Sequence, residues 1–337
     1  MNNLRGQQRV LVTGASGAVG PRVVQALCAA GYRVRTLSLY GSSQRQWPDD
    51  VEMRIGDVTD RDAVHSAVQG VEAVVHMAAL LHIVNPPPSL HTKYKHVNVD
   101  GTYLVMQESL REGVRRVLFF STIAIYGISR GEILNEDSPT YPKSFYEQTK
   151  HEAEYIVLHA PESTGQHIGT VLRIGAIYGS RIKGNYRQLL KALAKSRFIP
   201  IGHGRNRRTL IYDKDLARAA VLALQHPGAG GKIFNVSDGE FHTLNDIIAA
   251  MCKALGRKTP RLSLPIRPVR LAVGIVEDAA RLVGRQPPIT RAAIDKYAED
   301  IAVDSRRIQK ELGFVPKFDL AAGWEDTVQE MRRSGEL

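Results

Sequence analysis

The chain has 337 residues, 43% of them hydrophobic and 23% charged, a composition typical of a soluble globular protein with one large or two closely joined domains. Its two cysteines, Cys28 and Cys252, lie far apart and form no Cys-x-x-Cys pair, so we expect neither a disulfide framework nor a metal site. The formal net charge is +11, no apolar signal segment is visible at the start, and three prolines interrupt the uncharged run 73–92, so we expect a cytoplasmic protein without a membrane span.

Short apolar runs alternate with amphipathic stretches through the first half of the chain. This strand–helix order predicts a parallel, doubly wound α/β sheet. The expected strands are 10–13, 34–37, 53–55, 73–77, 117–121 and 170–173. The expected helices are 18–30, 60–68, 93–112 and 147–160.

The turn after the first predicted strand carries three glycines, each three residues after the last. Glycines between a strand and a helix let the backbone approach a pyrophosphate, and the start of the helix supplies N–H groups with a partial positive charge. We therefore predict a dinucleotide site at this turn. The residues expected to form it are Gly14, Ser16, Gly17, Ala18, Val19 and Gly20.

The segment after the second predicted strand bears on which dinucleotide binds. A carboxylate there would bind the ribose 2′-hydroxyl of NAD, whereas a basic residue accepts the 2′-phosphate of NADP. Residues 36–45 contain no carboxylate, and Ser42, Ser43 and Arg45 are available to hold a phosphate, so we expect NAD(P) with a preference for NADP. Ser38 is a further expected cofactor contact. After the third strand, Asp57 either accepts from the adenine amino group or caps the next helix.

Tyr146 and Lys150 are the candidate catalytic pair. They lie four residues apart and therefore one turn apart on a helix face. A nearby ammonium lowers the pKa of a phenol from its ordinary value of about 10, which would make Tyr146 an acid/base near neutrality. Thr122 follows a buried strand and either hydrogen-bonds a substrate oxygen beside Tyr146 or is satisfied locally at the strand end.

Over nearly its whole length the chain resembles the extended short-chain dehydrogenase/reductase family, in its sugar-nucleotide epimerase/dehydratase branch. The motifs that carry the resemblance are Thr13-Gly14-x-x-Gly17-x-x-Gly20, Gly56-Asp57, His76-Met77-Ala78-Ala79, Asn98-Val99-Asp100-Gly101-Thr102, Ser121-Thr122…Tyr126-Gly127, Tyr146…Lys150 and Arg173…Tyr178-Gly179. The resemblance implies a Rossmann-type NAD(P) domain in 1–178, completed by about 212–236. It also implies a smaller C-terminal α/β substrate lobe in 179–211 and 237–337, and a homodimer.

Roles for individual residues follow from the same resemblance. Tyr146 is expected to be the acid/base, Lys150 to bind the nicotinamide ribose and tune Tyr146, and Thr122 to hydrogen-bond the substrate. Asn98 is expected to support the site from the preceding helix. The remaining expected cofactor contacts are Val58, Ala78 and Ala79.

The residues after Thr122 narrow the chemistry. Dehydratases of the resembled family carry Asp-Glu there, and related decarboxylases carry a glutamate in the second of these places, whereas this chain has Ile123 and Ala124. An aliphatic side chain cannot move protons, so we expect neither dehydration nor decarboxylation. Hydride transfer at a carbinol or carbonyl remains, by a reductase, a dehydrogenase or a 4-epimerase.

The positive charge is confined to the second half of the chain. Residues 1–170 hold 16 Lys and Arg against 17 Asp and Glu, whereas residues 171–337 hold 29 against 17. Such asymmetry predicts an anionic partner for the second half.

The resemblance also implies which residues bind that anionic partner. Asn185 helps hold a nucleotide or caps a helix, and Arg208, whose forked guanidinium suits two phosphoryl oxygens, contacts the diphosphate. Arg205 and Arg207 are either helpers or solvent-facing charges, and Asp215 is expected to cap the helix 216–225. We therefore expect a nucleotide-sugar substrate, most like a UDP-linked N-acetylhexosamine changed at its 4-position.

Residues 269–283 have apolar side chains at helical spacing with charges between them. Core or dimer packing is the favoured interpretation, and covering the substrate or touching a membrane are the alternatives. A 3β-hydroxysteroid-type or other lipid alcohol dehydrogenase therefore stays open as a second hypothesis, although an apolar substrate would not explain the basic half. A non-catalytic NADP-sensing or RNA-binding relative is disfavoured because Thr122, Tyr146 and Lys150 are all present, so we expect no nucleic-acid partner.

Overall fold

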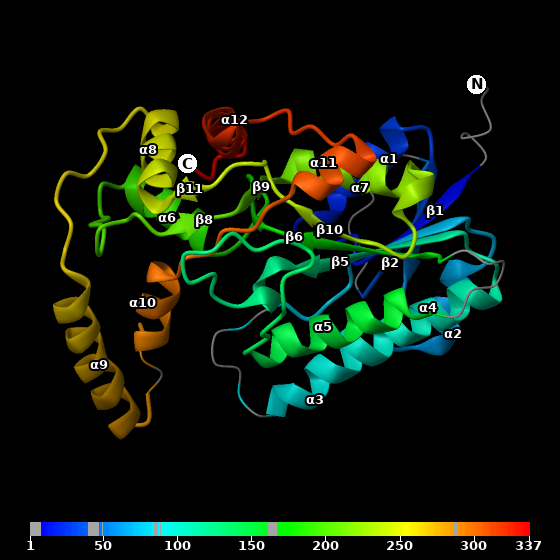
Figure 1. Ribbon diagram of the computed structural model, residues 1–337, viewed down its shortest axis with the longest axis horizontal. Coiled ribbons are helices and arrows are strands. Elements are labelled where there is room, and N and C mark those ends of the chain that lie inside the picture. Colours follow the sequence, from blue (N-terminus) through cyan, green and yellow to red (C-terminus); the bar gives the residue numbers. More distant parts are fainter. Residues whose placement is uncertain are drawn as a thin grey trace.

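The computed structural model describes residues 8–39, 47–48, 50–81, 83, 87, 89–160, 167–285, 287 and 289–337. Its centre is a seven-stranded parallel sheet in the order β10-β6-β5-β4-β1-β2-β3 (Figure 1). The strands are β1 (Arg9–Thr13), β2 (Arg33–Ser38), β3 (Glu52–Ile55), β4 (Ala73–His76), β5 (Arg116–Thr122), β6 (Gly169–Ile174) and β10 (Ile233–Val236). The doubly wound α/β class expected from the alternating pattern is confirmed.

Helices cover both faces of this sheet (Figure 1). On one face lie α2 (Arg61–Val68), α3 (Ser89–Lys95), α4 (Gly101–Arg111) and α5 (Phe145–Leu158), and on the other α1 (Gly20–Ala29), α7 (Asp213–Gln225) and α11 (Arg306–Leu312). Because successive strand residues point to opposite faces, Val10 and Val12 of β1 pack with α1 and α7 while Leu11 packs with α2 and α4. Near-continuous apolar strands are typical of a parallel sheet buried on both sides.

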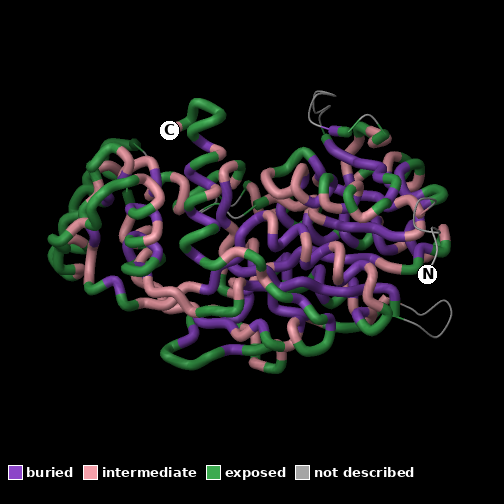
Figure 2. Tube along the Cα trace, turned by 90° about the horizontal axis from the view of Figure 1, so that it is seen from above, coloured by how far each residue is buried: buried purple, intermediate pink, exposed green. Residues whose placement is uncertain are grey.

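The second lobe is built from two short strand pairs and several helices. β7 (Ala176–Tyr178) pairs in parallel with β9 (Leu210–Tyr212), and β8 (Arg207–Arg208) pairs antiparallel with β11 (His242–Thr243). The helices α6 (Asn185–Ala194), α8 (Leu244–Leu255) and α12 (Leu320–Arg333) enclose a separate apolar cluster around Trp324. Beyond them lie α9 (Ile266–Leu282) and α10 (Arg291–Ala298), at the end of the molecule where Figure 2 shows mostly exposed residues.

Three local expectations need correction. The helix expected over 93–112 is α3 and α4 joined by a π-helical turn, η3 (His96–Asp100). Residues 306–314, assigned to the substrate lobe from the sequence, pack on the sheet core through Ile308, Leu312 and Phe314. Asp215 does not cap α7, because that helix already begins at Asp213; its buried carboxylate accepts from the backbone N–H groups of 317 and 318 instead.

Within the described ranges, no helix has the length and apolar character needed to cross a membrane.

Candidate active site

The glycine turn between β1 and α1 is held by close backbone contacts. Gly14 has a φ of 70°, and a Cβ there would lie 2.7 Å from the backbone of Ala78 on the neighbouring strand loop. The N–H of Gly14 donates to the carbonyl of Leu37 at 2.9 Å, and the N–H of Ser16 donates to the Oγ of Ser38 at 3.2 Å. The turn is therefore fixed against the ends of both neighbouring strands.

The start of α1 offers unused hydrogen-bond donors. Within the described part of the chain, the backbone N–H groups of Ala18 and Val19 donate to no protein acceptor. Val19 is the N-cap and provides no side-chain cap, and the first turn contains no acidic residue. Free N–H groups at a helix start, beside exposed Ser16 and Gly17, fit the phosphate oxygens of a dinucleotide.

Two further predicted cofactor contacts, Asp57 and Val58, follow β3. The Oδ1 of Asp57 accepts from the N–H of Thr59 at 3.0 Å, while Asp60 rather than Asp57 caps α2. Val58 is buried against Gly101. Ser42, Ser43 and Arg45, on which the expected NADP preference depends, lie outside the described residues.

The buried histidine of the His76-Met77-Ala78-Ala79 motif ties β1, β4 and α4 together. His76 Nδ1 lies 2.6 Å from the Oγ1 of Thr13, and His76 Nε2 lies 3.0 Å from the Oγ1 of Thr102. Thr102 donates its own hydroxyl proton to the carbonyl of Asn98, so the imidazole donates from Nε2 and accepts at Nδ1. Burial, with the charge of Lys150 nearby, lowers the pKa of His76 to about 3, which keeps this neutral tautomer across ordinary pH.

Asn98 connects the loop after β4 to the catalytic helix. Its Oδ1 accepts from the N–H of Leu80 at 2.7 Å, and its Nδ2 donates to the Leu80 carbonyl and to Thr149 Oγ1. The Thr149 hydroxyl donates in turn to the carbonyl of Tyr146 at 2.9 Å. Asn98 therefore fixes the position of the loop that contains Ala78 and Ala79 relative to Tyr146 on α5.

Tyr146 lies in the first turn of α5, and the start of this helix is stabilised by a capping box between Ser144 and Glu147. Ser144 accepts from the N–H of Glu147, and the Glu147 carboxylate accepts from the N–H groups of Lys143 and Ser144. The ring of Tyr146 packs edge-on against buried Tyr94, with centroids 6.4 Å apart. This cap and this ring contact fix where the phenol points.

The pKa of Tyr146 moves in the direction opposite to the one expected from the sequence. Burial raises it above its ordinary value, and Tyr94 and Glu147 act in the same direction. Lys150 is itself buried, and burial lowers the pKa of its ammonium to about 7 although Glu154 acts to raise it. Lys150 therefore carries only part of its charge near neutrality and supplies little of the field that would lower the phenol pKa.

Lys150 and Glu154 lie one turn apart on the buried face of α5. The Nζ of Lys150 lies 3.9 Å from the ring centroid of Phe119 on β5. Glu154 receives a forked contact from Arg173 of β6, with Nη2–Oε2 at 2.8 Å and Nε–Oε2 at 3.1 Å, and also the hydroxyl of Ser121. The four-residue spacing of Lys150 and Glu154 could have predicted that they lie side by side on the helix. The contact between Glu154 and Arg173 could not be predicted in this way, because it joins elements that are distant in the sequence.

The same network continues beyond the catalytic helix. Arg173 Nη1 donates to the hydroxyl of Tyr126 at 2.8 Å, and Tyr126 donates to Asn235 Oδ1 on β10 at 2.9 Å. Burial raises the pKa of Tyr126 to about 12, so its hydroxyl remains a donor. One continuous polar path therefore joins α5 to three strands of the sheet.

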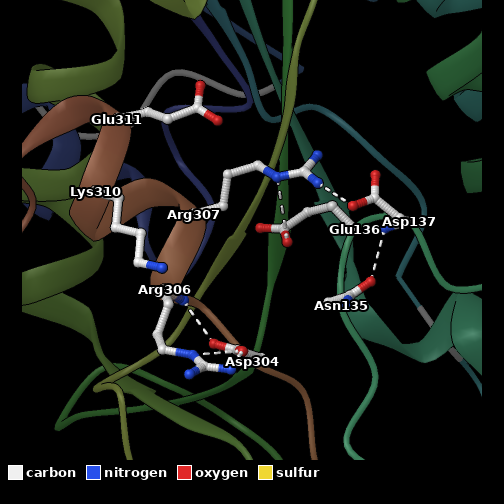
Figure 3. Close-up of a pocket in the computed structure, with 8 residues that line it drawn as sticks. All are labelled: Asn135, Glu136, Asp137, Asp304, Arg306, Arg307, Lys310 and Glu311. Carbon is white, nitrogen blue, oxygen red and sulfur yellow. Dashed lines mark hydrogen bonds and ion pairs between the residues drawn. The ribbon is translucent and has the colours of Figure 1, made fainter.

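The path ends at a charged cavity of about 300 Å³. Its lining residues are Asn135, Glu136, Asp137, Asp304, Arg306, Arg307, Lys310 and Glu311 (Figure 3). Glu136 accepts from the N–H of Asn235 at 2.8 Å, and Arg307 lies between Glu136 and Asp137. Burial raises the pKa of Glu136. Because the acids and bases here pair with one another, we assign no ligand to this cavity.

Thr122 ends β5 and caps the short 3₁₀ helix η4 (Ile123–Tyr126), accepting from the N–H of Ala124 at 3.1 Å. That bond uses a lone pair of the hydroxyl and leaves its proton free to be donated. Both of the alternatives stated for Thr122 are therefore compatible with its geometry.

The predicted diphosphate residues lie in the second lobe. Arg208 is half-buried in β8, and its Nη2 donates to the carbonyls of Lys296 and Tyr297 in α10 at 2.7 and 2.9 Å. Asn185 is exposed as the first residue of α6, after Gly184. Arg207, in contrast, is committed to Asp300, with Nη2–Oδ2 at 2.7 Å.

Comparison with known proteins places the chain among relatives of similar length. Residues 10–237 match the model of the NAD dependent epimerase/dehydratase family. Over 322 residues the chain is 28% identical to the N-acetyl-alpha-D-glucosaminyl-diphospho-ditrans,octacis-undecaprenol 4-epimerase of Escherichia coli O157:H7, covering 95% of this chain and 94% of that one. Over 339 residues it is 30% identical to Sterol demethylase protein B of Methylococcus capsulatus, covering 96% and 98%. The structure of UDP-glucuronic acid 4-epimerase from Bacillus cereus in complex with NAD is similar with a TM-score of 0.77 at 19% identity, covering 97% and 99%.

Proposed function

The chain belongs to the NAD-dependent epimerase/dehydratase family, and from that premise we propose that it transfers a hydride at the 4-position of a nucleotide-diphosphate sugar. The sugar is of the UDP-N-acetylhexosamine type, and the reaction is 4-epimerisation or reduction of a 4-keto group. The observation that carries the proposal is the single cluster of Tyr146, Lys150 and the Asn98-held loop beside the open end of α1.

The glycine turn fits a nicotinamide dinucleotide. The unused N–H groups of Ala18 and Val19 would bind its pyrophosphate, and Lys150, one turn below Tyr146, would bind its ribose hydroxyls. When bound, the nicotinamide ring supplies the hydride acceptor or donor. Several structural neighbours bind NAD. The lack of a carboxylate in 36–45 favours NADP, and we propose that preference for this chain.

Tyr146 would handle the proton of the reacting oxygen. Its raised pKa keeps the phenol protonated near neutrality, which suits donation to a carbonyl oxygen that becomes a carbinol. Oxidation of a carbinol requires the phenolate form of Tyr146, whose oxygen would accept the carbinol proton. Thr122, with its hydroxyl proton free, would orient the reacting oxygen toward Tyr146.

The residues beside Thr122 disfavour elimination. Ile123 is buried and aliphatic, and the side chain of Ala124 is a methyl group, so neither place offers a proton carrier. We therefore propose a reductase or an epimerase rather than a dehydratase. The basic second half and Arg208 support a diphosphate on the substrate.

A lipid alcohol dehydrogenase is the second candidate. Two observations favour it: the apolar, exposed side chains of α9, and the similarity to a protein named for sterol demethylation. It shares the hydride-transfer chemistry and differs in the substrate.

Product analysis with defined substrates separates these functions. We expect purified protein supplied with NAD or NADP to interconvert UDP-N-acetylglucosamine and UDP-N-acetylgalactosamine, or to reduce a UDP-linked 4-keto N-acetylhexosamine with consumption of NADPH. Interconversion without net use of added dinucleotide identifies an epimerase. Turnover of a 3β-hydroxysteroid with no turnover of any nucleotide sugar would overturn the proposal in favour of the second candidate.

A further inference from the structure

Helix α9 turns an apolar face toward solvent. Val273 and Glu277 are buried, and the carboxylate of Glu277 accepts from the N–H of Arg291 at the start of α10, whereas residues on the opposite side of α9 are exposed. Leu271 is 70% exposed, Ile275 65% and Leu282 88%. We call the exposed set the α9 strip; its members are Leu271, Ala272, Ile275, Val276, Leu282 and Val283. Figure 1 shows α9 at the outer edge of the lobe, with α10 between it and the rest of the chain.

The chain around the α9 strip is strongly basic. From Arg257 to Arg291 it holds eight Lys and Arg against two acidic residues. Both acids are occupied by Arg291, which lies 3.6 Å from Glu277 and 2.5 Å from Asp278. The exposed arginines of this segment without an ion pair among the described residues are Arg257, Arg261, Arg267 and Arg285, and of these Arg257 donates to the carbonyl of Ala194 at 3.1 Å. Unpaired cations beside an apolar face match a surface that is both apolar and anionic.

A second copy of the chain is a poor fit for the α9 strip. With 17 residues, α9 is about 25 Å long and its face about 10 Å wide, so the strip covers on the order of 250 Å², against roughly 800 Å² per partner in a standard interface. Two α9 strips placed together would also bring arginines of like charge near one another.

We infer that α9 docks on the surface of a lipid bilayer that carries anionic headgroups. The α9 strip lies at the boundary between headgroups and acyl chains, and Arg267 and Arg285 lie beside the phosphates. The inference rests on α9 alone and does not depend on the reaction proposed above. Helix α10 connects α9 to the candidate site, because its carbonyls at Lys296 and Tyr297 accept from Arg208. Docking of α9 would therefore bring the substrate lobe close to the headgroups.

Flotation of the full chain with vesicles tests this inference. We expect binding to vesicles of phosphatidylcholine and phosphatidylglycerol in equal parts, and at least about tenfold weaker binding to phosphatidylcholine alone, because each basic residue near an anionic surface strengthens binding about fivefold. The double variant R267Q/R285Q should lose the difference between the two vesicle types. Failure of the wild-type chain to float with phosphatidylglycerol vesicles would overturn the inference.

The double variant L271E/I275E tests the α9 strip itself. We expect at least about a tenfold loss of vesicle binding, since two exposed apolar side chains become charged. The matched control is V315E, because Val315 is 68% exposed on a loop away from α9. Both variants should unfold at the wild-type temperature, which separates loss of docking from loss of fold. Equal binding by L271E/I275E and wild type, or a wild-type dimer that L271E/I275E converts to a monomer without any vesicle binding, would overturn the inference.

Discussion

Among the ionisable side chains that helix α5 buries, Lys150 and Glu154 lie against the sheet, whereas α9 holds Leu271 and Ile275 in contact with solvent. Each arrangement is costly in isolation, because a buried charge loses its hydration and an exposed apolar side chain keeps its contact with water. On α5 the structure supplies a partner for Glu154, the guanidinium of Arg173. For the exposed apolar side chains of α9, the described residues supply no covering partner. The charged contacts of α5 are therefore completed within the chain, whereas the exposed apolar side chains of α9 have no such partner among the described residues.

The largest expected effect follows from removing the internal partner on α5. Glu154→Gln leaves Arg173 as a buried charge without its carboxylate, and we expect a loss of about 3–5 kcal/mol in the free energy of unfolding. Denaturant unfolding measures it. The matched control is Glu152→Gln on the exposed side of the same helix, whose contact with Lys95 is 3.9 Å long and solvent-exposed, with an expected change under about 1 kcal/mol. Equal effects of the two variants would contradict the buried network.

A smaller effect, dependent on pH, is expected at His76. Its pKa is about 3 in the folded chain and about 6.5 when unfolded, so the unfolded state binds the extra proton between these values and stability falls as pH decreases through that window. From pH 6 to pH 4.5 the loss attributable to His76 is about 2 kcal/mol. For His76→Gln we expect the free energy of unfolding to fall by correspondingly less over this pH range. A pH slope identical to that of wild type would show that His76 is not held neutral.

The smallest expected effect is on α9 itself. Ile275→Lys should change the free energy of unfolding by less than about 0.5 kcal/mol, because this side chain is already exposed. Val273→Lys, two residues earlier and at a buried position, is the contrasting variant and should destabilise the chain clearly. Strong destabilisation by Ile275→Lys in the isolated protein would mean that the α9 strip is covered within the chain, and the comparison with α5 would fail.

Local patterns carried much of the prediction of the fold. The six strands expected in the first half lie within one or two residues of β1 to β6, because buried parallel strands are short apolar runs bounded by turn residues. The turn with Gly14 was also predictable from a local pattern, because the positive φ at this position requires a glycine. Ser42 and Arg45 remain predictions.

Contacts between distant segments could not be predicted. The pKa of Tyr146 depends on burial under Tyr94, which belongs to another helix, and not on the spacing to Lys150 alone. The motif around Arg208 indicated a diphosphate contact but gave no sign of the α10 carbonyls that hold the guanidinium. For α9 the helical period of its apolar residues identifies the apolar face and favours core or dimer packing, yet the period alone does not say what that face contacts.

The most direct test of the proposed chemistry is single-turnover hydride transfer by Tyr146→Phe. Phenylalanine keeps the ring packed on Tyr94 and removes only the proton carrier. We expect a rate, measured from nicotinamide absorbance, at least about 100-fold below that of wild type, with dinucleotide affinity changed by less than about threefold. A near-wild-type rate in this variant would contradict it.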